Sequence, residues 1–236
     1  MSGSEQEVGV INHRGDIVLI SFKEYYIDDS GNEVLLTESK EPVAVIIGSP
    51  ALNPAVGTAL MTMKEGDTRV VSIDGSMMFG VRDPMNVVTV PLKPLQDMGF
   101  NPQVGQTITM GMRTGRIIKV TEDSVTVDFN HPLAGRTIYS KVTLIRRLKK
   151  DAEGIRAVIK SAFGQFADVV MVKVRKGLID IYMTPDVLMM ANLPLTLTML
   201  GVSLSIAFPT KVVQYHITPK VVQTGGEDTR PMAKVQ

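Results

Sequence analysis

The feature that most constrains the fold is the stretch of residues 127–139, just past the middle of the chain. It predicts a strand that runs into a polar Asn130-His131-Pro132 turn, then a second turn at Gly135 and a new strand. Pro132 fixes its own φ and pushes His131 toward an extended conformation, and Gly135 permits a turn with positive φ. The stretch is typical of a return loop, with an inserted segment before it and a closing strand after it. A catalytic role for His131 is the alternative that the loop leaves open.

The composition excludes several classes of site and partner. The chain has 236 residues, with 25 Lys and Arg against 24 Asp and Glu, so it lacks the concentrated positive charge of a nucleic-acid-binding protein. It contains no cysteine, which excludes disulfides, thiolate catalysis and cysteine metal ligands. The three histidines, His13, His131 and His216, are far apart in the sequence. We therefore expect no metal site, no cofactor and no nucleic-acid partner.

Two segments bear on localisation. Residues 1–7 lack the basic start and the apolar stretch of a secretory signal, which favours a cytoplasmic protein. Residues 187–210 carry no charge along a stretch long enough to span a bilayer. However, Asn192, Pro194 and Gly201 interrupt this stretch. The pattern favours two short buried helices or an oligomer contact, and we expect no membrane partner.

The first eighty residues predict an antiparallel sheet with a single short helix across it. Apolar residues alternate through the first strand, and turn signals separate it from the next ones. Asn53-Pro54 combines an N-cap with a first-turn proline, so a short helix is expected to begin there. Strands are expected at residues 16–26, 34–36, 43–47 and 68–73.

The rest of the chain differs in character. Residues 85–127 hold short apolar pieces between prolines and turn signals, which predicts a small β-rich unit. Residues 151–224 predict the order helix, strand, strand, helix, helix, strand, which suits an α+β domain. The basic residues at 146–150 are typical of a strand end or linker, and the polar residues 225–236 of a disordered tail. The expected fold class is therefore α+β.

A family resemblance rests on the return loop. Asp128-Phe-Asn-His-Pro-Leu-Ala-Gly135 resembles the signature that brings the chain back into the main domain in SlyD-like FKBP-type peptidyl-prolyl cis-trans isomerases. Residues 15–22 resemble the first core strand of that family, residues 63–68 the turn after its helix, and residues 78–80 its Tyr-Gly loop. The segment before the signature lies where the family carries its insert-in-flap domain. The extra C-terminal domain matches the long archaeal type, in which it is implicated in dimerisation.

The resemblance implies a three-part organisation. An antiparallel FKBP-type sheet wrapped on one short helix would be discontinuous, built from residues 1–84 and 128–150. The insert-in-flap domain would cover residues 85–127, and the C-terminal domain residues 151–224.

The resemblance also implies cis/trans isomerisation of X-Pro bonds without covalent catalysis. The barrier of about 18–20 kcal/mol comes from lost amide resonance, and a dry apolar pocket favours the twisted state over the planar one. Ser140 aligns with an aromatic residue of the family's closing strand, and a shift of one residue would place Tyr139 there. The pocket positions carried over are Phe22, Leu36, Thr37, Leu52, Asn53, Val56, Phe79 and Tyr139.

Two of these positions depart from the family pattern. Thr37 replaces an Asp, and Phe79 replaces a tyrosine whose hydroxyl donates a hydrogen bond to the substrate. Each change removes a polar anchor worth about 1 kcal/mol, so we expect the isomerase activity to be weak. The alternative is a catalytically silent peptide-binding chaperone on the same scaffold.

The insert supplies a second expected role, the binding of unfolded or nascent polypeptide clients. Methionine adapts to many partners, and an extended client can pair along a strand edge. The opposing interpretation is that the same residues form the small core of the insert. A third hypothesis is a structural or assembly factor that binds a fixed partner through residues 187–210, and a homodimer through residues 151–224 is expected. The candidate client-binding residues are Val90, Leu92, Leu95, Met98, Phe100, Met110 and Met112.

Overall fold

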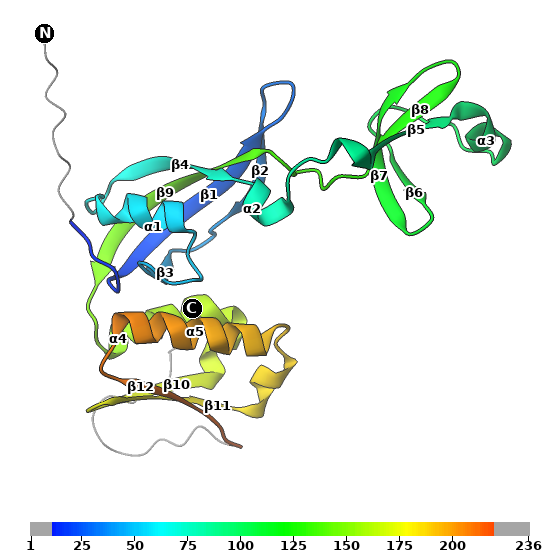
Figure 1. Ribbon diagram of the computed structural model, residues 1–236. Coiled ribbons are helices and arrows are strands. Elements are labelled where there is room, and N and C mark those ends of the chain that lie inside the picture. The colour runs from blue at the N-terminus through cyan, green and yellow to red at the C-terminus, as the bar shows by residue number, and fades with distance from the viewer. Residues whose placement is uncertain (1–10, 220–236) are drawn as a thin grey trace, which may run out of the picture. The chain divides into compact units, whose positions relative to one another are not determined.

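The computed structural model describes residues 11–219, which form two compact units (Figure 1). The larger unit holds the described residues up to Tyr25, Asn32–Ser72, and those from Tyr139 onward. The smaller unit holds Tyr26–Gly31 and Ile73–Ile138. The predicted disordered tail at residues 225–236 lies outside the described residues.

The first sheet has five strands and confirms the antiparallel sheet expected from the sequence. The order is β2-β1-β9-β4, with β3 paired separately on β1 in the antiparallel register Ile17↔Ile46. The strands are β1 (Ile17–Ile27), β2 (Glu33–Glu38), β3 (Val43–Ile46), β4 (Thr68–Asp74) and β9 (Thr137–Leu148).

The single short helix of this part is α1 (Pro54–Met61). It begins as the sequence predicts, because the Asn53 side chain accepts a hydrogen bond from the Ala55 N–H (3.0 Å) and Pro54 occupies the first turn. At its other end, the buried Asn12 amide donates to the Leu60 and Met63 carbonyls (2.7 and 2.8 Å). These bonds satisfy carbonyls that the end of a helix leaves without partners.

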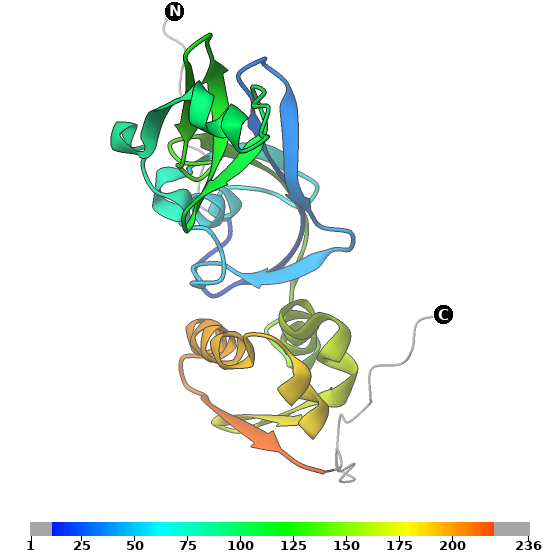
Figure 2. The same ribbon diagram turned by 90° about the vertical axis from the view of Figure 1, so that its right-hand side faces the viewer.

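The C-terminal part packs two helices on a mixed sheet. The sheet order is β10-β11-β12, in which β10 and β11 are antiparallel and β11 and β12 are parallel. Figures 1 and 2 show α4 and α5 as a layer between this sheet and β3. The elements are α4 (Ala152–Phe163), η2 (Gly164–Val169), β10 (Val170–Arg175), β11 (Leu178–Met183), η3 (Pro185–Met189), α5 (Leu193–Ala207) and β12 (Val212–Ile217).

One hydrophobic core joins the C-terminal part to the first sheet. Ile17, Ala44 and Ile46 are buried in the same cluster as residues of α4, α5, β10 and β11. The Ala44 N–H also donates to Ser161 Oγ on α4 (2.8 Å). The packing therefore continues across residue 150, and the domain boundaries expected from the sequence stay predictions.

The uncharged segment 187–210 forms a 3₁₀-helix and an α-helix. The first of the two expected helices is the short 3₁₀-helix η3 (Pro185–Met189), and the second is α5 (Leu193–Ala207). In α5, Leu200 and Leu204 are buried, whereas Leu195 is 55% and Val202 is 45% exposed. Within residues 11–219, no helix is long and apolar enough to cross a membrane.

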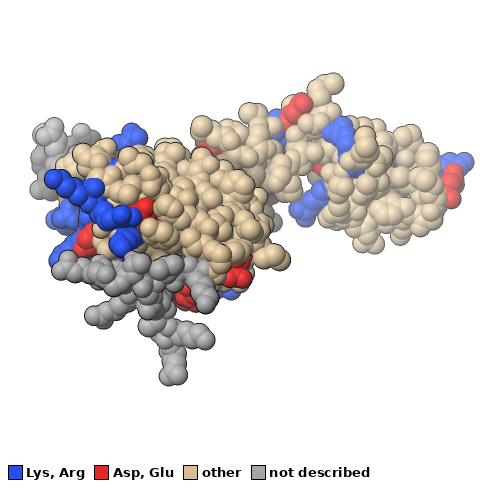
Figure 3. Space-filling model, turned by 90° about the horizontal axis from the view of Figure 1, so that it is seen from below, with Lys and Arg blue, Asp and Glu red and all other residues tan. Residues whose placement is uncertain are grey.

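Basic side chains gather at one end of the larger unit (Figure 3). The residues expected as a strand end or linker partly continue β9 and form ion pairs at its end. Arg147 and Lys150 both lie beside Asp16, at 3.8 and 3.3 Å, and Arg146 lies 3.9 Å from Glu153. This pairing supports the interpretation of the cluster as a solvated strand end.

The smaller unit contains a four-stranded antiparallel sheet in the order β5-β8-β7-β6. The sequence predicted only short strands here and missed the helix α3. Pro94 lies in the first turn of this helix, where a missing N–H costs nothing, and Leu95 turns into the core of the sheet. The elements are α2 (Ser76–Phe79), η1 (Pro84–Asn86), β5 (Val87–Pro91), α3 (Leu92–Asp97), β6 (Thr107–Met110), β7 (Arg113–Val120) and β8 (Ser124–Asp128).

Candidate functional site

One face of β1 carries Phe22 and Glu24. Both backbone groups of Phe22 bond to Ser39: its N–H donates to Ser39 Oγ (3.0 Å), and its carbonyl accepts from the Ser39 N–H (2.9 Å). Glu24, two residues on, bonds to Ser140 on β9. Phe22, Glu24 and Ser140 therefore share one face of the sheet, since side chains two apart on a strand point the same way.

The Glu24 carboxyl is half-buried beside the fully buried Ser140. Burial raises the pKa of Glu24 above its ordinary value, and the Ser140 hydrogen bond partly opposes this shift. Burial disfavours the charged carboxylate, whereas a hydrogen bond to it favours that form. This polar pair was not among the sequence candidates, because the alternation that pairs the two residues appears only once the strands are aligned.

Tyr139 lies on the face of β9 opposite Ser140. Its ring stacks on Tyr25, with centroids 5.5 Å apart and planes at 22°. Alternation along β9 turns Ile138, Ser140 and Val142 inward and leaves Tyr139 half-buried. The assignment of Tyr139 to the pocket stays a prediction, and of these two neighbours it is Ser140 that lies on the face that holds Phe22.

The remaining candidates of the larger unit occupy β2 and the start of α1. Leu36 and Thr37 are exposed on β2. Leu52 is half-buried just before the helix, the Asn53 side chain is engaged as its N-cap, and Val56 is buried in the core. The candidate residues on these elements are neutral and mostly apolar, which suits a site that works by excluding water rather than by proton transfer.

Phe79 belongs to the smaller unit, where it ends α2. Its ring stacks on His131, with centroids 4.7 Å apart and planes at 8°. The His131 Nδ1 also accepts a hydrogen bond from the Leu133 N–H (3.2 Å). His131 is therefore held inside the return loop, where it supports Phe79.

The backbone at the start of α2 lies in close contact with the return loop. Gly75 donates its N–H to the Arg136 carbonyl (3.0 Å), and a Cβ on Gly75 would lie 2.3 Å from that oxygen. Only glycine permits this approach. The Gly75 requirement was not predicted, because Gly75 and Arg136 are distant in sequence.

Asn130 ties together the two segments that connect the insert. Its Oδ1 accepts from the Asp83 N–H (2.9 Å), and its Nδ2 donates to the Asp83 carbonyl (2.9 Å). Arg82 Nη2 pairs with Asp128 Oδ2 at 2.7 Å, and Asp128 Oδ1 accepts from both nitrogens of Asn130. In the sequence, the Asp128-x-Asn130 spacing is the one local pattern that could have predicted part of this hydrogen-bond network.

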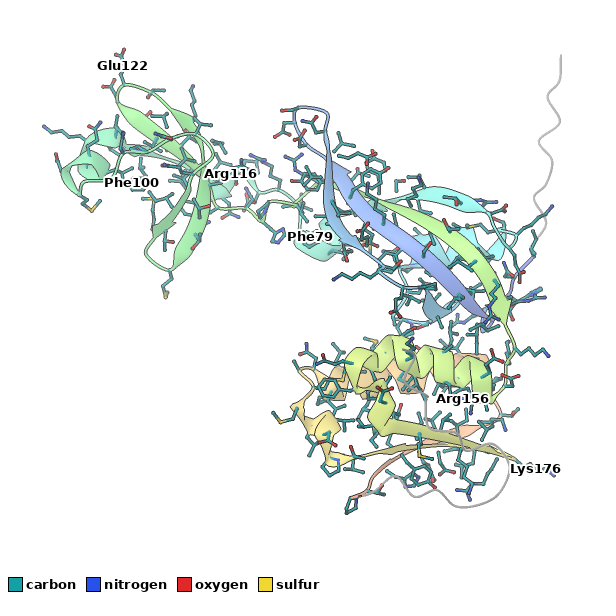
Figure 4. All side chains as sticks on the ribbon, turned by 180° about the vertical axis from the view of Figure 1, so that it is seen from behind. Phe79, Phe100, Arg116, Glu122, Arg156 and Lys176 are labelled. Atoms are coloured by element: carbon teal, nitrogen blue, oxygen red, sulfur yellow. The ribbon has the colours of Figure 1, made fainter. Side chains whose placement is uncertain are left out.

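The structure separates the seven candidate client-binding residues of the insert. Leu95 is buried in its core, and Val90, Leu92, Phe100 and Met110 pack partly buried against that core. Figure 4 shows Phe100 beside α3. Met98 is 74% exposed, and Met112 is fully exposed. The two methionines are thus the members of the set that remain accessible.

Within the described part of the chain, no group of three His, Asp or Glu side chains lies together in a way that could hold a metal ion. The candidate residues of the larger unit are mainly aromatic and aliphatic, with the hydroxyls of Thr37 and Tyr139 and the amide of Asn53. Such groups can stabilise a less polar form of a bound amide.

Comparisons with known proteins agree with this arrangement. A family model described as "FKBP26, IF domain" matches residues 88–133. The chain is 36% identical over 98 residues to the short-type peptidyl-prolyl cis-trans isomerase of Methanocaldococcus jannaschii, which covers 42% of this chain and 62% of that protein. The match thus spans less than two thirds of that relative's length.

Two bacterial relatives extend the comparison. The probable FKBP-type 16 kDa peptidyl-prolyl cis-trans isomerase of Pseudomonas fluorescens is 32% identical over 120 residues, 50% of this chain and 80% of that protein. The FKBP-type peptidyl-prolyl cis-trans isomerase SlyD of Aeromonas hydrophila is 31% identical over 126 residues, 51% of this chain and 58% of that protein. About half of this chain stays outside each alignment.

Proposed function

We propose that this chain, which belongs to the FKBP-type peptidyl-prolyl cis-trans isomerases and carries their insert-in-flap domain, isomerises X-Pro bonds in unfolded or nascent polypeptides. The observation that carries the proposal is the 32% identity that extends over 80% of the P. fluorescens relative. The apolar candidate residues Phe22, Leu52 and Val56 also support the proposed isomerase activity.

The chemistry requires no general acid or base. The barrier to rotation, about 18–20 kcal/mol, reflects resonance that a twisted C–N bond loses. The twisted amide has less charge separation, so an apolar surface such as Phe22 and Val56 stabilises it relative to the planar amide. Thr37 and Phe79 lack the Asp carboxylate and the tyrosine hydroxyl of the family, which is why we propose a weak activity.

The insert would hold the client while the pocket acts on its prolyl bonds. The accessible Met98 and Met112 support this division of roles, because unbranched thioether side chains adapt to varied apolar partners. The exposed apolar residues Leu195 and Val202 on α5 support a homodimer contact in the C-terminal part.

The isomerase assignment is tested on the full chain with a folding reaction limited by prolyl isomerisation. We expect the slow phase to accelerate in proportion to protein concentration. Phe22→Ala should reduce this acceleration, whereas Leu35→Ala, a substitution at an exposed β2 residue, should leave it unchanged. A slow phase that is not accelerated even at stoichiometric protein would contradict the assignment.

A second candidate function is a peptide-binding chaperone without isomerase activity. The absence of both polar anchors at Thr37 and Phe79 favours it. Deletion of residues 86–126 distinguishes the roles: it should abolish suppression of client aggregation while leaving turnover of a short prolyl peptide. Loss of both activities would argue that the two roles are not separable.

A further inference from the structure

A polar cavity of about 650 Å³ lies within the smaller unit, between the insert sheet and the segments that connect it. Its walls come from β6 and β7, from the return loop, and from the tip of the β1–β2 hairpin. Three arginines line it, Arg82, Arg116 and Arg136, against two carboxylates, Asp29 and Asp128. The cavity therefore carries an excess of one positive charge.

Both carboxylates already have cationic partners. Asp128 pairs with Arg82 at 2.7 Å, and its other oxygen accepts hydrogen bonds from Asn130. The two oxygens of Asp29 each lie 3.1 Å from Arg136 Nη2, and the Arg136 guanidinium also lies over the Tyr26 ring. Neither acid forms an ion pair with Arg116.

Arg116 is the lining arginine without an acidic partner among residues 11–219. It lies on β7 opposite Thr107 on β6 and Asp128 on β8. Its Nη2 passes over Gly105, at 3.6 Å from the position that a Cβ on that glycine would take. In Figure 4, Arg116 lies at the end of the insert next to the connecting segments, away from Phe100.

We propose that Arg116 binds a carboxylate of the client chain, so that this protein prefers clients with an acidic group near the bound segment. The inference rests on the proposed client-binding function and adds a charge preference to it. A guanidinium presents a rigid fork of donors that matches a carboxylate. Because Arg82 and Arg136 are paired with the two acids, Arg116 supplies the net positive charge of the cavity.

The expected size of the preference follows from the exposure of Arg116. An exposed ion pair contributes little and is weakened by salt. We expect a client with a suitably placed glutamate to bind roughly two- to five-fold more tightly than its glutamine counterpart at low ionic strength. The difference should shrink as salt is added.

The test measures the binding of fluorescein-labelled, end-capped peptides to the full chain by anisotropy. Each peptide contains one apolar-Pro bond, and Glu or Gln is placed in turn at each flanking position. Arg116→Gln should remove the Glu preference. The matched control Lys119→Gln removes a charge from an exposed residue of the same strand outside the cavity, and it should retain the preference.

The outcomes are distinct. A Glu preference that is lost in Arg116→Gln and retained in Lys119→Gln supports the proposal. Equal binding of Glu and Gln peptides, or a preference that persists in Arg116→Gln, overturns the proposal while client binding stands. Failure of all peptides to bind overturns client binding as well, and isomerisation is then judged separately by the refolding assay.

Discussion

The Phe79 ring lies almost parallel to the His131 ring, with centroids 4.7 Å apart and planes at 8°. His131 belongs to the loop by which the chain returns from the insert, and Phe79 is the residue that the family resemblance assigns to the pocket tyrosine. The return loop therefore supports a candidate catalytic ring rather than supplying a catalytic histidine.

The first prediction concerns this ring pair. An aromatic stack contributes about 0.5–1.5 kcal/mol beyond its buried area. We expect His131→Ala to lower kcat/KM on a short prolyl peptide roughly three- to ten-fold, because Phe79 loses its support. His131→Phe keeps a flat ring and should restore most of the activity. If His131→Phe is as impaired as His131→Ala, the imidazole itself is needed and the positioning role is wrong.

The second prediction concerns the missing polar anchors. The double variant Thr37→Asp/Phe79→Tyr restores a carboxylate and a hydroxyl, each worth about 1 kcal/mol as a net hydrogen bond. We expect kcat/KM to rise by roughly ten-fold or more, and each single variant to give part of the gain. Turnover of a short prolyl peptide measures the effect, and an unchanged rate would contradict the carried-over pocket positions.

The third prediction concerns Glu24 and pH. Burial raises the pKa of Glu24 above its ordinary value of 4.5, so the folded protein holds this proton more tightly than the unfolded chain. Stability is therefore lost as pH rises from 4.5 through the raised pKa. Glu24→Gln keeps an oxygen that can accept from Ser140 but avoids the charge.

We expect Glu24→Gln to raise Tm modestly at pH 7, where the Glu24 carboxyl of the unfolded chain is ionised. At pH 4 the carboxyl is mostly protonated, so the substitution should leave Tm nearly unchanged. Glu38→Gln, at an exposed residue of β2, is the control and should show no such pattern. Thermal unfolding at several pH values checks this. A lower Tm for Glu24→Gln at pH 7 would show that the hydrogen bond outweighs the burial cost.

The fourth prediction concerns the accessible methionines of the insert. Met98→Gln/Met112→Gln should weaken the Kd for an unfolded client roughly ten-fold, because burying an apolar side chain contributes about 1.5–3 kcal/mol. Met189→Gln, at a methionine that is 82% exposed in the C-terminal part, is the matched control. Equal losses in the control and the double variant would show a non-specific effect of surface polarity.

The fifth prediction concerns assembly. Leu195→Glu/Val202→Glu should convert a dimer to monomers in sedimentation velocity, because a buried, unpaired carboxylate is costly. Val212→Glu introduces the same charge at a 61%-exposed residue of β12 and should leave the dimer intact. Dissociation by Val212→Glu alone would place the contact on the C-terminal sheet. A chain truncated after residue 150 is a poor substitute, because Ile17, Ala44 and Ile46 would lose the core they share with α4 and α5.

Short sequence patterns predicted much of the secondary structure. Asn53-Pro54 predicted the start of α1, and the alternation of apolar residues predicted β1, because caps, proline and strand periodicity act between residues close in sequence. The return loop and its family resemblance likewise depended on eight consecutive residues. The helix α3 was missed, because its prolines resemble turn signals and its stability comes from Leu95 packing on the insert sheet.

By itself, the sequence indicated the α+β class, the β-rich insert and the family resemblance. The tertiary structure decided which residues meet: that Ser140 rather than Tyr139 shares a sheet face with Phe22, that His131 lies under Phe79, and that Arg116 forms no ion pair with an acid among residues 11–219. These relationships join residues far apart in the chain. A one-residue change of strand register would reverse the faces, and ion pairing depends on distances of a few ångströms that only the folded packing sets.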